Sequence, residues 1–103
     1  MLQQGYRIFG LFEDGEMLAI AGVTIATDYA FLRHLWLHDL VVQEGHRSRG
    51  LGRQLLEYVH DFARQQGCER VILETGPRRV DTIRFYTEKM GYQQGSVIFE
   101  KDL

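Results

Sequence analysis

The stretch from Val41 to Gln66, VVQEGHRSRGLGRQLLEYVHDFARQQ, governs the interpretation of the whole chain. Its pattern indicates the end of a buried strand, then a basic loop, and then a long amphipathic helix. Gly50 and Gly52 stand where the loop becomes the helix, so backbone N–H groups can approach a ligand without a Cβ in the way. The helix dipole adds positive potential at the same point. The stretch therefore predicts an anion-binding site.

Three strand-like segments lie before the loop. Residues Tyr6 to Phe12 and Met17 to Thr27 are rich in strand-forming side chains and flank a Glu-Asp-Gly-Glu turn, which predicts a hairpin. Residues Arg33 to Val42 alternate in part and then become wholly apolar, as a strand does when it enters the centre of a sheet. The chain is therefore expected to begin with three antiparallel strands.

The pattern after the loop predicts a strand-helix-strand crossover and then a second helix. The first helix is expected to end at Gly67, because glycine commonly follows a helix in this position. A short buried strand at Arg70 to Glu74, a helix at Val80 to Met90, and a final strand at Tyr92 to Lys101, which a glycine can divide, complete the chain. The order β-β-β-α-β-α-β(β) indicates the α/β class (α+β, mixed sheet), with helices covering a sheet.

Composition limits what the chain can be. Its 103 residues allow one domain, residues 1–103, with a single core. The formal net charge of −2 at pH 7 is unlike the strongly basic balance of a general nucleic-acid binder, so an anion site must be local. No apolar run reaches the roughly 18 residues that a membrane span needs. We therefore expect neither a nucleic-acid partner nor a membrane partner.

The cysteine and histidine content argues against a metal site. Cys68 is the only cysteine, so an intrachain disulfide and a cysteine-based metal cage are both excluded. His34, His46 and His60 have no recognisable zinc spacing. A single thiol fits a reducing compartment, and the start of the chain has no signal-peptide core. We therefore expect a cytoplasmic protein without a metal.

Three kinds of glycine loop bind phosphate groups, and their spacing distinguishes them. A P-loop needs G-x-x-x-x-G-K-[ST], which the sequence lacks. A dinucleotide fingerprint needs G-x-G-x-x-G, but Leu55 stands where the third glycine should be. The string from Arg47 to Gly52, RSRGLG, is instead an R-x-x-G-x-G loop that follows a buried strand and opens a helix.

This loop resembles the pyrophosphate loop of the GNAT superfamily of acetyl-CoA-dependent N-acetyltransferases. The segment from Phe85 to Tyr92, FYTEKMGY, is similar to the family's second signature, in which an aromatic-Tyr pair precedes a Gly-aromatic helix exit. The resemblance extends from Leu35 to the C-terminus. It implies a GNAT-like acyltransferase fold and direct transfer of acetyl from acetyl-CoA to a primary amine, carried by a small molecule or a peptide.

The resemblance also implies which residues bind acetyl-CoA. In family members the strand before the loop splays from its neighbour, and its free backbone groups pair with the pantetheine arm. Val41, Val42 and Gln43 match this strand end. The loop and the helix start would hold the pyrophosphate through backbone N–H groups and basic side chains. The residues concerned are Arg47, Ser48, Arg49, Gly50, Leu51, Gly52 and Arg53.

Acetyl transfer needs an acid for the leaving thiolate and a base for the amine. Tyr86 matches the tyrosine that family members often place near the CoA sulfur as a general acid. His38 and Asp39 are the candidates for the base, and because side chains alternate along a strand, at most one of them is expected to face the cleft. Asp39 lies near the position of an acidic residue in many relatives, whereas His38 has the more convenient ordinary pKa.

The chain departs from the family pattern in two ways. Relatives often have Asn seven residues before the signature tyrosine and Ala four before it, but this chain has Arg79 and Thr82. From the resemblance, we also expect the chain to start at the family's second strand, without elements that help to build the acceptor side. Either a second subunit completes that wall in a homodimer, because an unpaired strand edge is a template for association, or the chain is a CoA-binding or regulatory module with weak or no transfer.

Overall fold

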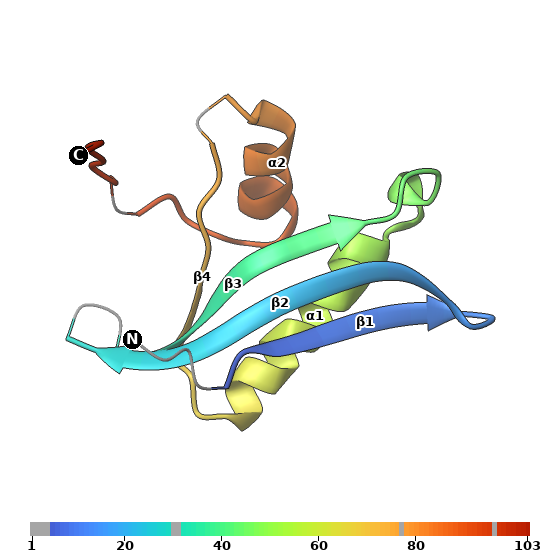
Figure 1. Cartoon of the computed structure of the whole chain (residues 1–103), viewed down its shortest axis with the longest axis horizontal. Helices are drawn as coiled ribbons and strands as arrows, with labels where there is room; N and C mark the ends of the chain where they lie inside the picture. Colours follow the sequence, from blue (N-terminus) through green and yellow to red (C-terminus); the bar gives the residue numbers. More distant parts are fainter. Residues whose placement is uncertain (1–4, 30–31, 77, 96) are drawn as a thin grey trace.

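Four strands form one mixed sheet in the order β1-β2-β3-β4 (Figure 1). The structure is a computed structural model that describes residues 5–29, 32–76, 78–95 and 97–103. The strands β1 (Arg7–Glu13), β2 (Glu16–Asp28) and β3 (Leu32–Val42) are antiparallel to one another, and β4 (Arg70–Ile72) pairs in parallel with β3. The expected α+β class with an antiparallel start is confirmed.

The hairpin between β1 and β2 closes through a two-residue turn. Asp14 and Gly15 both have positive φ angles, 51° and 81°, which is the conformation of a type I′ turn. Such a turn matches the twist of the flanking strands, so Glu13 and Glu16 pair directly across it. The predicted hairpin is therefore present, and β1 is an edge strand of the described sheet.

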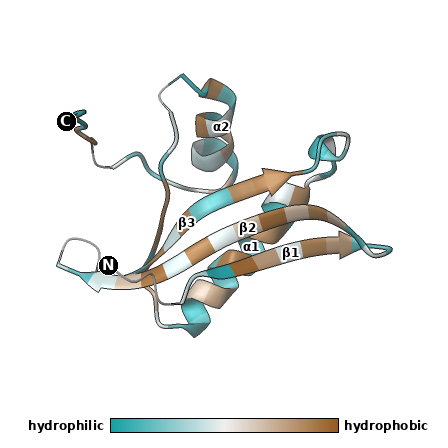
Figure 2. Ribbon diagram, viewed as in Figure 1, coloured by the Kyte–Doolittle hydropathy of each residue, from teal (hydrophilic) through white to brown (hydrophobic). Residues whose placement is uncertain are grey.

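Helix α1 (Leu51–Gln65) packs on one face of the sheet and forms the core with it (Figure 1). Its apolar stripe meets β2 and β3, and hydrophobic residues also run along the strands in Figure 2. These contacts remove apolar surface from water, which is the main stabilising term for a small domain. The buried cluster consists of Ala19, Ala21, Val23, Leu35, Leu37, Leu55, Leu56, Val59 and Ala63.

Helix α1 ends as its glycine predicts. Gly67 has a φ of 76°, and its N–H donates to the carbonyl of Arg64 at 3.1 Å. The N–H of Cys68 donates to the carbonyl of Ala63 at 2.9 Å. These two bonds make a Schellman motif, which satisfies carbonyls that the helix end leaves without partners. The chain can then turn directly into β4.

The second helix is less regular than its sequence pattern predicts. Helix α2 (Val80–Arg84) continues as a π-helical segment, η2 (Phe85–Lys89), and Gly91 ends it with a φ of 77°. The N–H of Met90 donates to the carbonyl of Phe85 at 3.1 Å, five residues back. Such π segments widen one turn of a helix and are frequent at functional sites.

The expected final strand from Tyr92 to Lys101 is not present in the described residues. Residues 92–95 and 97–103 belong to no strand, and Ser96 lies outside the described residues. The expected strand at Arg70 to Glu74 is also shorter, because pairing stops at Ile72. Strand-forming side chains are not sufficient, because a strand also needs a neighbouring backbone for its N–H and C=O groups. The side chain of Phe99 is 91% exposed instead.

None of the helices in the described part of the chain is long and apolar enough to cross a membrane.

We expect Leu56→Ala to lower the free energy of unfolding by about 2–5 kcal/mol, because Leu56 is 0% exposed and its removal leaves a cavity between α1 and the sheet. Urea unfolding followed by circular dichroism would measure the change. Leu103→Ala is the matched control, since that leucine is fully exposed, and we expect a change within about 0.5 kcal/mol. Equal losses in the two variants would contradict the assigned core.

Candidate active site

A cleft opens where β3 and β4 separate. The two strands pair only from His34 to Trp36 on β3, opposite Arg70 to Ile72 on β4. Beyond this point the chain after β4 turns away toward α2 (Figure 1). From Leu37 onward, this side of β3 has no paired strand in the described residues, so its backbone groups are open to a ligand. The cleft has a volume of about 230 Å³.

The cleft brings together residues that are far apart in the sequence. Three of the predicted site residues line it from β3, and Tyr86 lines it from η2. The three on β3 are His38, Asp39 and Val41. Sequence analysis did not propose Glu74 or Thr75, which follow β4 and also line the cleft. The full lining is Leu37, His38, Asp39, Leu40, Val41, Leu73, Glu74, Thr75, Arg79, Thr82 and Tyr86.

His38 and Asp39 both line this cleft, but so do all residues from Leu37 to Val41, so the expectation that at most one of the two side chains faces it stays a prediction. β3 has a bulge here, because Asp39 lies opposite Gly22 of β2 and Leu37 lies opposite Val23, so His38 has no partner in the pairing. The extra residue shifts the alternation of side chains by one position.

Hydrogen bonds and ring contacts hold the His38 side chain in place. Its Nε2 lies 2.7 Å from the hydroxyl oxygen of Thr24 on β2. Its ring stacks between those of Tyr6 and Trp36, with centroid distances of 5.8 Å and 6.3 Å. Tyr6 also donates its hydroxyl proton to Oδ2 of Asp39 at 3.1 Å, and this bond raises the pKa of Tyr6. Only the strand register reveals Tyr6 as a neighbour, because it lies 33 residues from Asp39.

Tyr86 is held by a chain of contacts that reaches α1. Its carbonyl accepts a hydrogen bond from the N–H of Tyr92 at 2.9 Å, and the two rings meet edge to face at 5.3 Å. The hydroxyl of Tyr92 lies 2.7 Å from Nε2 of His60 on α1. Burial raises the pKa of Tyr86 above its ordinary value, so the hydroxyl keeps its proton near neutral pH. A protonated tyrosine at this place can act as an acid.

The loop before α1 leaves backbone donors open. A single 3-10 turn (Arg47–Arg49) leads to Gly50, whose φ of 74° makes it the N-cap of the helix. No side chain caps α1, and the first helical bond joins the N–H of Gln54 to the carbonyl of Gly50 at 3.1 Å. In the described structure the N–H groups of Leu51, Gly52 and Arg53 therefore have no capping partner. Together with the helix dipole, such open N–H groups are able to bind an anion.

The basic side chains near this site are engaged with protein groups. Arg47 donates from Nε to the last carbonyl of β3 at 3.3 Å. Arg49 pairs with Glu13 at 2.9 Å, and Arg53 pairs with Glu57 at 3.3 Å. Arg49 lowers the pKa of Glu13 through this hydrogen bond. Exposed ion pairs of this kind contribute about 0–1 kcal/mol, so an arriving phosphate can compete for either arginine.

The remaining predicted cofactor residues lie at the end of β3. Val41 lines the cleft, whereas Val42 packs against the core on the other face. The N–H of Gln43 donates to the carbonyl of Leu18 at 2.8 Å, so that group is already used inside the sheet. Of these three residues, Val41 is therefore the one that lies beside the cleft.

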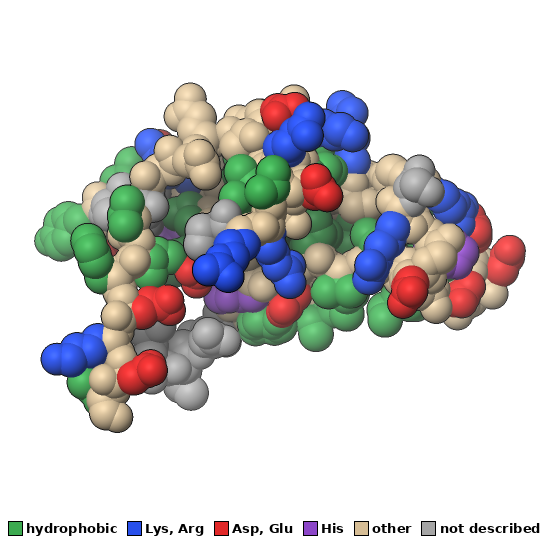
Figure 3. Space-filling model, turned by 90° about the horizontal axis from the view of Figure 1, so that it is seen from above, with side chains coloured by type: hydrophobic (Ala, Val, Ile, Leu, Met, Phe, Trp, Pro, Cys, Tyr) green, Lys and Arg blue, Asp and Glu red, His purple; other side chains and the backbone are tan. Residues whose placement is uncertain are grey.

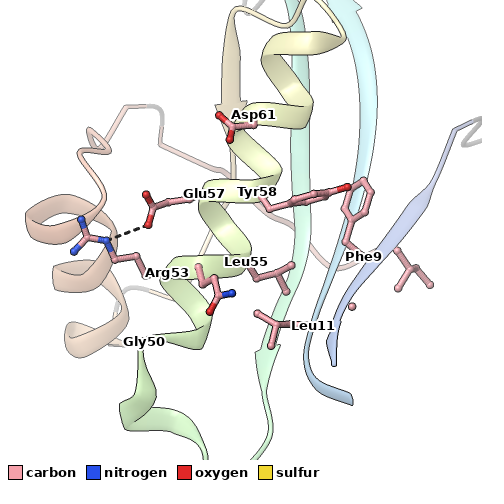
Figure 4. Close-up of a pocket in the computed structure, with 11 residues that line it drawn as sticks. Phe9, Leu11, Gly50, Arg53, Leu55, Glu57, Tyr58 and Asp61 are labelled. Carbon is pink, nitrogen blue, oxygen red and sulfur yellow. Dashed lines mark ion pairs between the residues drawn. The ribbon is translucent and has the colours of Figure 1, made fainter. Parts of the chain in front are cut away.

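A larger hollow of about 700 Å³ lies between β1 and α1 (Figure 4). Phe9 and Leu11 line it from β1, and Tyr58 and Asp61 line it from α1. It contains none of the three predicted catalytic residues, so its size does not identify it as the reaction site. Gly50 at its end connects it with the loop.

Figure 3 shows Lys and Arg side chains in separate places with Asp and Glu beside several of them.

Within the described residues, no three His, Cys, Asp or Glu side chains lie close enough together to hold a metal ion.

Residues 1–92 match the sequence model of the Acetyltransferase (GNAT) family. The chain belongs to this family. The uncharacterized N-acetyltransferase YhdJ of Bacillus subtilis is 38% identical to it over 99 residues, which are 96% of this chain and 70% of that protein. Streptothricin acetyltransferase of Streptomyces lavendulae is 33% identical over 79 residues, which are 77% of this chain and 40% of that protein. Its membership of the GNAT family and its similarity to YhdJ identify the protein as an N-acetyltransferase.

Solved structures show the same GNAT fold. A putative acetyl transferase from Pyrococcus furiosus matches with a TM-score of 0.87 at 24% identity, covering 98% of this chain and 68% of that one. The aminoglycoside N-acetyltransferase AAC(6')-Iy, in complex with CoA, matches with a TM-score of 0.83 at 22% identity, covering 95% and 76%. At these identities the likeness concerns the fold.

We expect His60→Gln to flatten the dependence of stability on pH. Burial lowers the pKa of His60 below its ordinary 6.5, Arg64 adds to the effect, and Glu57 and Asp61 oppose it. Below about pH 6.5 the unfolded chain therefore binds more protons than the folded chain, and stability falls as the pH drops toward the lowered pKa. Gln keeps an acceptor for Tyr92 but does not titrate. Urea unfolding at about pH 7.5 and about pH 5.5 would test this, and equal losses on acidification would contradict it.

Proposed function

We propose that the protein transfers the acetyl group of acetyl-CoA directly to a primary amine. The observation that carries this proposal is the cleft at the separation of β3 and β4, which unites His38, Asp39 and Tyr86. It lies on the strand that leads into the uncapped start of α1. A donor bound along β3 would thus have an anion site at one end and acid-base groups at the other.

In this proposal, backbone groups bind most of the donor, acetyl-CoA, and we call their site the donor half. The N–H groups of Leu51, Gly52 and Arg53 would hold the pyrophosphate, and the open edge of β3 near Val41 would pair with the pantetheine arm. The fit is supported by the space at Gly52, since a Cβ there would meet only Val42 at 3.5 Å. Arg47 and Arg49 are within the same loop and can add charge-assisted bonds.

In the acceptor half, where the amine would react, side chains carry out the proton transfers. Asp39 would take the proton that the ammonium group must lose, so that the amine nitrogen can attack the thioester carbonyl carbon. His38 is the alternative base, since it lines the same cleft. When the carbon-sulfur bond breaks, Tyr86 would donate its proton to the departing sulfur. No covalent bond to the protein is needed.

The acceptor is proposed to be a small-molecule or peptide amine. This proposal draws on relatives that carry names such as streptothricin acetyltransferase and aminoalkylphosphonate N-acetyltransferase. A panel of amino sugars, aminoalkylphosphonates, aliphatic amines and short peptides, assayed with acetyl-CoA by release of free thiol, tests it. Tight CoA binding with no thiol release from any amine would instead make the chain a CoA-binding or regulatory module.

Two further expectations stay predictions. A homodimer would cover the edge of β1, which is unpaired in the described sheet. A cytoplasmic location accords with the single cysteine and with the need for acetyl-CoA.

The substitution Gly52→Ala distinguishes an effect on CoA affinity from an effect on the stability of the fold. We expect CoA affinity to fall at least about tenfold, because the new Cβ would stand where the backbone approaches the pyrophosphate. Stability should stay the same or rise by up to about 1 kcal/mol, because alanine favours a helix and only ordinary contact with Val42 arises. Calorimetric titration with CoA and urea unfolding would measure both quantities. Gly95→Ala, which introduces no contact within 4 Å, is the matched control, and unchanged CoA affinity in Gly52→Ala would remove the phosphate-site argument.

Tyr86→Phe should lower kcat by about 100-fold or more, with CoA affinity within about twofold, because a positioned acid contributes roughly 10²–10⁴ to the rate. Steady-state thiol release and CoA titration would give the two values. Tyr58→Phe removes a hydroxyl from the other hollow and should leave kcat unchanged. If the two variants turned over equally fast, Tyr86 would be a packing residue only.

A further inference from the structure

Tyr6 reaches across the sheet to the proposed base. It lies just before β1, yet its hydroxyl donates to Oδ2 of Asp39 on β3 at 3.1 Å, over the intervening β2. Its ring also stacks on that of His38, with an interplanar angle of 27°. One side chain from the start of the chain therefore contacts both candidate bases.

Gly22 makes this reach possible. Gly22 lies opposite Asp39 in the middle of β2, a position where glycine weakens a strand. Its φ angle is not positive, so the backbone conformation does not require a glycine there. A Cβ built on Gly22 would collide with the hydroxyl of Tyr6 and would lie 3.2 Å from Oδ2 of Asp39. The absence of a side chain at this position thus provides the space through which the hydroxyl meets the carboxylate.

We infer that Tyr6 is a positioning residue for Asp39, and that Gly22 is present to admit it. The inference rests on the proposed function. The hydrogen bond engages Oδ2 and would restrict the rotation of the carboxylate, so that Oδ1 would be left for the acceptor amine. The ring contact with His38 steadies the adjacent bulge residue from the same side. Tyr6, just before β1, therefore belongs to the acceptor half of the proposed site.

Tyr6→Phe tests the role of the hydroxyl. We expect kcat to fall about tenfold with CoA affinity unchanged, because the base is displaced while the donor site is untouched. Tyr58→Phe is the matched control and should change neither quantity.

A double-mutant cycle tests the role of Gly22. In the unaltered chain, Gly22→Ala should lower kcat about tenfold, since the new methyl displaces the Tyr6 hydroxyl. In the Tyr6→Phe background the same change should lower kcat by a smaller factor than in the unaltered chain, because the colliding hydroxyl is gone and only the milder contacts with the ring and with Oδ2 of Asp39 remain. Circular dichroism and CoA titration would establish that each variant is folded.

The possible outcomes separate this inference from the proposed function. An active protein in which Tyr6→Phe leaves kcat unchanged would overturn the role of Tyr6 alone. Multiplicative effects of Tyr6→Phe and Gly22→Ala would overturn the role of Gly22. If the unaltered protein binds CoA but acetylates no amine, the proposed function and this inference both fail.

Discussion

The short parallel pairing of β3 with β4 is the constraint on which the rest of the site depends. Parallel strands need a crossover, here α1, and the crossover brings β4 back to β3 over three residue pairs only. The unpaired length of β3 is energetically tolerable because it faces a cleft that water or a ligand can enter. The same strand leads into the open start of α1. The proposed donor site and the proposed reaction cleft therefore lie along one backbone edge.

Local sequence patterns predicted much of this structure because their causes are local. Gly67 ends α1 through a Schellman motif, Asp14 and Gly15 form the hairpin turn, and Gly50 caps α1, each because of the backbone conformation that it adopts. The bulge at His38 and the contact of Tyr6 with Asp39 depend on strand register and had no local signal. The expected last strand was wrong for a related reason, since a pattern reports propensity but not whether a partner strand is present.

The two halves of the proposed site use different chemistry, which explains why the sequence predicts one more clearly than the other. The donor half is built from backbone N–H groups, and its spacing is fixed by two glycines and a helix start, so a short motif is enough to find it. The acceptor half is built from side chains on β3, after β4 and before β1, which only the folded sheet assembles. The π-helical segment that carries Tyr86 belongs to this second group.

The stack of rings around His38 gives the molecule an intrinsic optical probe. Trp36 is the only tryptophan in the chain, and its ring centroid lies 6.3 Å from that of His38. Indole emission responds to its surroundings, and here the indole lies against His38, which lines the cleft. Occupation of the cleft beside His38 can therefore be followed in the unlabelled protein by the fluorescence of one residue.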